Sequence, residues 1–128
     1  MTIFSQSIGH IDERPWGRYE IIDQGEAFQV KRIEVNSGKR LSLQSHEHRK
    51  EYWIIISGRF KIQIDSAIDE YDPGDMVFIP IGAMHRPECI SKEKGIFIEV
   101  QQGDDLSEED IVRYEDDFGR GEGKLRTK

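Results

Sequence analysis

The stretch "GKRLSLQSHEHRKEYWIIISG", Gly38 to Gly58, sets both the fold and the kind of site to expect. Between two apolar runs it places one Gln, two His and two Glu within eight residues, Gln44 to Glu51. Residues two apart on a β-strand point to the same face, so Gln44 and His46 can reach one ion together. The intervening "EHRK" can form a tight turn, which would return the chain and point Glu51 inward from the neighbouring strand.

A second spaced motif runs from Gly74 to Cys89, where the turn "PIG" precedes His85. This placement would let His85 close the same site from a distant segment. Together with Gln44, His46 and Glu51, it offers two nitrogens and two oxygens, a donor set suited to Zn²⁺, Mn²⁺, Fe²⁺, Co²⁺ or Ni²⁺. Only Glu51 would be charged, so a bound divalent ion would stay a good Lewis acid.

The rest of the chain indicates an all-β domain, because short alternating runs are separated by turn residues. Many short strands at this spacing predict an antiparallel sandwich or barrel. We expect strands over Gly17–Asp23, Phe28–Val35, Lys39–His46, Tyr52–Ser57, Phe60–Asp65, Ala67–Tyr71, Asp75–Ile79, Arg86–Ile90 and Gly95–Gln101.

The stretch "LSEEDIVRYEDDFG" is the one helix signal, with Ser107 as N-cap and Asp110 three residues later. It predicts a short C-terminal helix over about 107–117, lying against the outside of the sheet. We expect a single domain over 1–120 with a core over about 14–103. Residues 121–128 are glycine-rich and should form a flexible tail.

Composition excludes several classes of protein. A length of 128 residues fits one domain, and a net charge of −7 argues against nucleic-acid binding. A lone cysteine, Cys89, rules out an internal disulfide and fits a reducing compartment. The N-terminus lacks the pattern of a signal peptide, and no apolar run is long enough to span a membrane. We therefore expect a cytoplasmic protein without a membrane or nucleic-acid partner.

The two spacings resemble the two cupin motifs, G-x5-H-x-H-x4-E-x6-G and G-x5-P-x-G-x2-H-x3-N. The resemblance implies a small cupin, a double-stranded β-helix or jelly-roll barrel, here with the short C-terminal helix. It also implies one divalent ion on Gln44, His46, Glu51 and His85, with Zn²⁺ favoured and Mn²⁺, Co²⁺, Ni²⁺ or Fe²⁺ as alternatives. The chain departs from the motifs in having Gln44 for a His and Cys89 for an Asn.

Four longer stretches narrow the resemblance. They are "RPWGRYE" at Arg14–Glu20, "VKRIEVNSGKRLSLQSHEHRKEYW" at Val30–Trp53, "IPIGAMHR" at Ile79–Arg86 and "IEVQQGDDLSEEDIVRYEDDFGR" at Ile98–Arg120. They resemble the type II mannose-6-phosphate isomerase (phosphomannose isomerase) domain, usually found behind a mannose-1-phosphate guanylyltransferase. The sequence has no room for that half, so we expect a stand-alone domain. The resemblance implies a metal-dependent aldose–ketose isomerase that interconverts mannose 6-phosphate and fructose 6-phosphate through an enediol.

Such a reaction needs cations for the phosphate and a base to move a proton between two carbons. A basic cluster beside the His-rich segment supplies the cations, with Arg49 first and Lys31, Arg32 and Arg40 as further substrate-binding candidates. His48, Lys31 and Glu99 are the candidate bases, and Arg49 is a candidate for catalysis as well as for binding. The choice among them stays open.

Two other functions remain open because Tyr52 and Cys89 replace residues usual in the resembled family. One is a non-catalytic cupin that binds a sugar or nucleotide sugar. The other is a cupin enzyme with a different substrate, such as another phosphosugar or a substrate of an Fe²⁺ dioxygenase. We expect a homodimer that pairs through sheet edges. Trp16, Trp53 and Phe78 should be core or subunit-interface aromatics.

Overall fold

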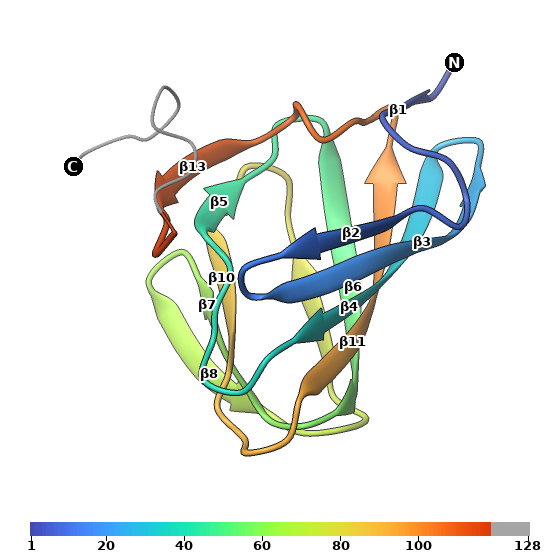
Figure 1. Cartoon of the computed structure of the whole chain (residues 1–128). Coiled ribbons are helices and arrows are strands. Elements are labelled where there is room, and N and C mark those ends of the chain that lie inside the picture. The colour runs from blue at the N-terminus through green and yellow to red at the C-terminus, as the bar shows by residue number, and fades with distance from the viewer. Residues whose placement is uncertain (119–128) are drawn as a thin grey trace.

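The computed structural model describes residues 1–118, which form two antiparallel sheets packed face to face and one short parallel pair (Figure 1). The larger sheet has the order β2 (Ile11–Arg14), β3 (Gly17–Gly25), β4 (Phe28–Val35), β11 (Gly95–Gly103), β6 (Arg49–Ser57), β9 (Met76–Ile79). The smaller sheet has the order β13 (Val112–Glu115), β5 (Leu43–Ser45), β10 (His85–Cys89), β7 (Phe60–Ile64), β8 (Ala67–Tyr71). The parallel pair joins β1 (Ile3–Phe4) to β12 (Asp105–Leu106).

Strand alternation builds the core between the two sheets. Along β6, alternate residues from Arg49 onward are buried, while the residues between them face outward. Trp53 on this strand stacks on Phe97 of β11, with ring centroids 4.5 Å apart. Phe97 in turn meets Phe60 of the smaller sheet edge-on at 5.3 Å. Trp16 and Trp53 are therefore core aromatics, whereas Phe78 lies on the outer face of β9 and is 47% exposed.

The expected C-terminal helix over 107–117 is wrong. A turn is followed by strand β13, which pairs antiparallel with β5 so that Val112 lies opposite Ser45. The pairing satisfies backbone groups at the edge of β5, which outweighs the local helix pattern. The tail expected at 121–128 lies outside the described residues. Residues 1–118 contain no helix, and so none that could cross a membrane.

All nine strands expected from the sequence are present, and β4 and β8 have the expected bounds. The expected strand over Lys39–His46 is shorter in the structure, since β5 covers only Leu43–Ser45. Residues before it make a single bridge between Arg40 and Glu88. The sequence did not predict β1, β2, β12 and β13.

Gly58 connects β6 to β7 with a φ of +77°, and a Cβ there would lie 2.7 Å from the Cα of Gly95. Gly74 has a φ of +94°, but open space surrounds its Cβ position. G58A should therefore lower the free energy of unfolding by about 3 kcal/mol, and G74A by only about 1 kcal/mol. Urea denaturation of both variants tests this, and equal losses would show that backbone conformation alone matters at Gly58.

Candidate active site

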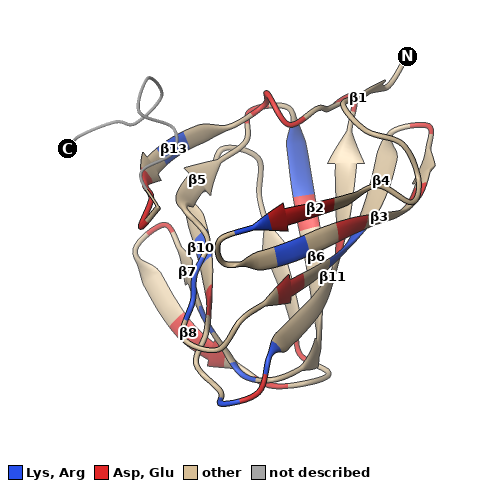
Figure 2. Cartoon of the chain, viewed as in Figure 1, with Lys and Arg blue, Asp and Glu red and all other residues tan. Residues whose placement is uncertain are grey.

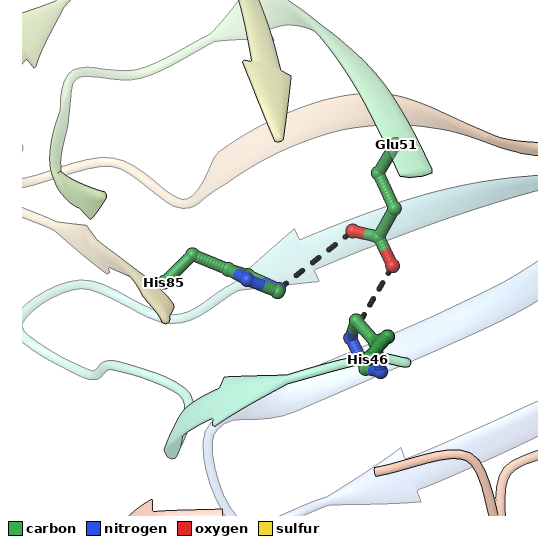
Figure 3. A group of neighbouring side chains, drawn as sticks. All are labelled: His46, Glu51 and His85. Atoms are coloured by element: carbon green, nitrogen blue, oxygen red, sulfur yellow. Dashed lines mark ion pairs between the residues drawn. The ribbon is translucent and has the colours of Figure 1, made fainter. Parts of the chain in front are cut away.

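Three buried side chains from separate segments of the chain meet inside the barrel (Figure 3). His46 follows β5, Glu51 lies on β6, and His85 begins β10. The Glu51 carboxylate lies 3.4 Å from Nε2 of His46 and 3.8 Å from Nε2 of His85. One ligand atom from each residue lies within 4.8 Å of the others. The structure thus brings together three of the four residues expected to hold an ion.

Backbone carbonyls hold both imidazoles in the orientation that a metal ligand needs. Nδ1 of His46 donates to the carbonyl of Asp110 at 2.7 Å, and Nδ1 of His85 donates to the carbonyl of Ala83 at 3.0 Å. Because Nδ1 carries the proton, the lone pair of each Nε2 faces Glu51. Burial lowers the pKa of both imidazoles, which favours their neutral form. Both are therefore ready to donate to a cation.

Glu51 is held by two donors in addition to facing the imidazoles. It accepts from Nε of Arg49 at 2.8 Å and from Nε1 of Trp53 at 3.0 Å. Burial tends to raise the pKa of Glu51, but the charge of Arg49 and its hydrogen bond to the carboxylate outweigh it and lower the pKa overall. Two neutral imidazoles and one ionised carboxylate form a set that fits Zn²⁺ or a similar divalent ion.

Arg49 lies directly against this donor set. Its Nη2 is 3.2 Å from Nε2 of His46, on the lone-pair side of the ring. An ion that binds His46 and Glu51 would therefore require this arginine to give up the His46 contact. The Arg49 side chain is 6% exposed, so its guanidinium would stay close to the site and face whatever binds there.

Gln44, the expected fourth ligand, lines the same pocket and lies opposite His85 in the strand pairing. Its amide nitrogen donates to the Ser42 hydroxyl at 2.9 Å. The amide oxygen is then the atom that could reach an ion. The membership of Gln44 in the ligand set stays a prediction.

The residues around this cluster line one pocket that is open to solvent. Glu99 lines it from β11 and is 4% exposed, and its Oε2 accepts from Nε2 of Gln101 at 2.6 Å. Burial, and then the charge of Glu51, raise the pKa of Glu99. A buried carboxyl that readily holds a proton therefore lies in the same pocket as the candidate metal ligands.

Lys31 enters the pocket from β4 beside Glu99, its partner in the strand pairing. Its Nζ donates to the Glu108 carboxylate at 2.6 Å and lies 4.1 Å from the ring centroid of Tyr19. Of the four expected substrate-binding cations, Lys31 and Arg49 face the pocket.

Three residues expected at the site lie elsewhere. Arg32 follows Lys31 on β4 and so points outward, where it pairs with Glu34 at 3.1 Å. Arg40 pairs with Asp117 on the surface at 2.8 Å. The His48 side chain is 58% exposed and lies in the turn between β5 and β6. None of these three side chains lines the pocket. The structure therefore gives no support to substrate binding by Arg32 and Arg40 or to catalysis by His48.

Asp110 supports the site in a way that the sequence did not reveal. Its carboxylate accepts from the backbone N–H groups of Glu47 and His48, both at 3.0 Å, while its carbonyl orients His46. The sequence pattern placed Asp110 in the first turn of a helix capped by Ser107 instead. Arg14, Tyr19 and Glu108 also line the pocket. In the sequence, only their place in the quoted stretches pointed to these three residues. Their contacts form where distant parts of the chain meet, and the spacing of a motif does not predict such contacts.

Residues 6–116 match the family model described as "Mannose-6-phosphate isomerase C-terminal". The chain belongs to this family. Mannose-1-phosphate guanylyltransferase ManC of Salmonella typhimurium is 43% identical over 107 residues, which cover 84% of this chain and 22% of that protein. The chain thus spans less than a quarter of the length of such curated relatives.

Two solved structures are similar in fold to this chain. An RmlC-like cupin from Shewanella frigidimarina matches with a TM-score of 0.66 and 17% identity, over 77% of this chain and 92% of that chain. An oxalate decarboxylase from Lactobacillus farciminis matches with a TM-score of 0.71 and 24% identity, over 81% of this chain and 33% of that chain. The chain is therefore an all-β cupin, as the motif spacing predicted.

Proposed function

We propose that the chain is a metal-dependent aldose–ketose isomerase that interconverts mannose 6-phosphate and fructose 6-phosphate. One observation carries the proposal: a single pocket combines the His46–Glu51–His85 cluster with a second buried carboxyl, Glu99. Isomerisation through an enediol needs an electrophile at the sugar oxygens and a proton carrier near the two carbons. The family to which the chain belongs supports the choice of substrate.

The residues of the cluster would hold one divalent ion, with Gln44 as the fourth ligand. Zn²⁺ is our first choice, and Mn²⁺, Co²⁺, Ni²⁺ and Fe²⁺ are alternatives. When bound, the ion would act as a Lewis acid that polarises the oxygens at C1 and C2 of the open-chain sugar.

Glu99 is our candidate for the proton carrier. It would take the proton from C2 of the aldose and return it to C1, while the hydroxyl proton at O2 passes to O1, so that no further reactant is needed. Its burial raises its pKa, and that brings the carboxyl closer to the working pH than an exposed glutamate would be. Gln101 holds the carboxyl in place, and Arg49 can donate to a sugar oxygen beside the cluster.

Metal removal and reloading test this proposal. Chelator-treated protein should lose turnover of mannose 6-phosphate, and one equivalent of Zn²⁺, Mn²⁺ or Co²⁺ should restore it, because three ligands converge on one position. A coupled assay of fructose 6-phosphate measures the result. The proposal is wrong if metal-loaded protein gives no turnover under conditions in which a guanylyltransferase-fused relative does.

A second candidate function is binding without catalysis, of a sugar or nucleotide sugar. The contact between Arg49 and His46 favours it, since the guanidinium already supplies a positive charge at the donor atoms. This candidate predicts saturable sugar binding by chelator-treated protein and no turnover with any metal.

A further inference from the structure

The Lys31 ammonium is a buried cation with an internal anionic partner. The side chain is 5% exposed, and its Nζ donates to the Glu108 carboxylate at 2.6 Å. On its other side, the face of the Tyr19 ring lies 4.1 Å away. A buried ammonium needs an anion, and here a side chain from the loop after β12 supplies it.

Glu108 lies in the positive field at this end of the pocket. Burial tends to raise the pKa of Glu108, but the charges of Lys31, Arg49 and Arg14 outweigh it and lower the pKa overall. Its backbone N–H donates to the Ser5 hydroxyl at 2.8 Å, which ties the loop to the N-terminal segment. The side chain itself is 32% exposed, so Glu108 lines the pocket where it meets the solvent.

We propose that Lys31 forms the phosphate subsite of the pocket, with Arg14 adding to its field, and that the Glu108 carboxylate occupies this subsite until a phosphate monoester displaces it. The identification of the ligand as the phosphate of a sugar rests on the proposed function. A phosphate dianion carries more charge than a carboxylate, and lysine binds it as a compact point charge. Lys31 also lies beside Glu99 in the strand pairing, so a sugar held at its phosphate would reach toward the proton carrier.

Calorimetry on the full chain tests this subsite, with inorganic phosphate and mannose 6-phosphate as probes. Chelator-treated protein is used, so that phosphate cannot bind to an ion. E108Q removes the competing charge but keeps the shape, and should tighten the binding of both probes by about tenfold. E109Q changes the net charge equally at an exposed neighbour and should leave both affinities unchanged. Unphosphorylated mannose should bind E108Q and the unmodified chain alike.

A double variant, E108Q/K31M, completes the test, because it removes both charges and leaves no buried ammonium unpaired. It should lose the binding of inorganic phosphate. Equal phosphate affinity of E108Q and the unmodified chain would overturn the proposal, as would an equal gain in E109Q. If the affinities change as expected while metal-loaded protein shows no turnover, the subsite stands and the isomerase function fails. If metal-loaded protein turns over mannose 6-phosphate but E108Q leaves the phosphate affinity unchanged, the isomerase function stands and the phosphate subsite fails.

The outer face of the larger sheet exposes a group of apolar side chains where β6 pairs with β9. Tyr52 lies beside Phe78 with ring centroids 5.1 Å apart, and Ile54 pairs with Met76 on one side and Ile98 on the other. The exposed apolar side chains of β6 and β9, each between 36% and 70% exposed, are Tyr52, Ile54, Ile56, Met76 and Phe78. Together they expose roughly 500 Å² if each full side chain is taken as about 200 Å².

We infer that this face binds a second copy of the chain, sheet against sheet, and not through the sheet edges expected from the sequence. Two such faces would bury about 1,000 Å², which reaches the lower limit for a specific interface. With a net charge of −7, two copies repel each other, and these five apolar positions of β6 and β9 carry no charge. Charged positions are scattered over other parts of the strands and loops (Figure 2). Sheets pack face to face in this way, and a twofold axis makes the face its own partner.

Sedimentation velocity over a range of concentrations tests this interface. The unmodified chain should form a dimer, and I54K should shift it to monomer by burying two unpaired charges. I68K is the matched control, because Ile68 is 57% exposed on β8 of the other sheet, and it should remain dimeric. A chain that stays monomeric at all concentrations, or an I54K variant that dimerises normally, would overturn the inference.

Discussion

Replacing Glu51 with glutamine should abolish stoichiometric metal binding and lower isomerase turnover by about a thousandfold or more. Glu51 is the one charged residue among the expected ligands, and both imidazoles face it. The amide keeps the shape and can still accept from Arg49 or Trp53, so the change mainly removes charge. Elemental analysis after dialysis and the coupled turnover assay measure the two effects.

Glu34 provides a matched control for this substitution. It is also a buried carboxylate with cationic partners, Arg18 and Lys94, but it lies on β4 away from the pocket. E34Q should destabilise the fold in a similar way and keep its metal and its turnover. If E51Q still binds one equivalent of metal, the assignment of the site is wrong. If E34Q loses metal to the same extent, the effect of E51Q reflects damaged folding.

The second large effect is expected at Glu99. E99Q should lower turnover by about a hundredfold to ten-thousandfold, while metal content and the Michaelis constant stay near those of the unmodified chain. The reason is that an amide cannot take up the proton from C2, although it can still fill the space in the pocket. If E99Q keeps more than a tenth of the turnover, the proton carrier must be a different group, and Lys31 is the remaining candidate in the pocket.

The pH dependence of Glu99 gives a separate check. Its pKa is raised in the folded chain, and only the deprotonated form can accept a proton, so turnover should rise as the pH passes through that raised pKa. Stability should change in the opposite direction. The protonated carboxyl favours the folded state, so its contribution is complete below the unfolded pKa and is lost as the pH rises through the folded pKa. E99Q should lack both trends, as turnover profiles and urea denaturation at several pH values would reveal.

The sequence determined much of the site because spacing along a β-hairpin dictates where side chains point. Strand alternation and the turn "EHRK" bring His46 and Glu51 to one face. The turn after Pro80 reverses the chain and brings His85 to the same place. The same alternation makes Lys31 and Arg32 point to opposite sides. Which of the two is buried could not be determined, because inward and outward positions of β4 are both partly apolar.

Only the tertiary structure decided what the segment 107–117 does. Its local pattern suits a helix, but the open edge of β5 offered backbone partners, and β13 took them. The resulting chain path brings Asp110 to His46 and Glu108 to Lys31, contacts between residues 64 and 77 positions apart. Local sequence determines the direction of a side chain along its own strand. The partners of that side chain depend on which strand edges are free when the sheets close, and distant segments compete for those edges.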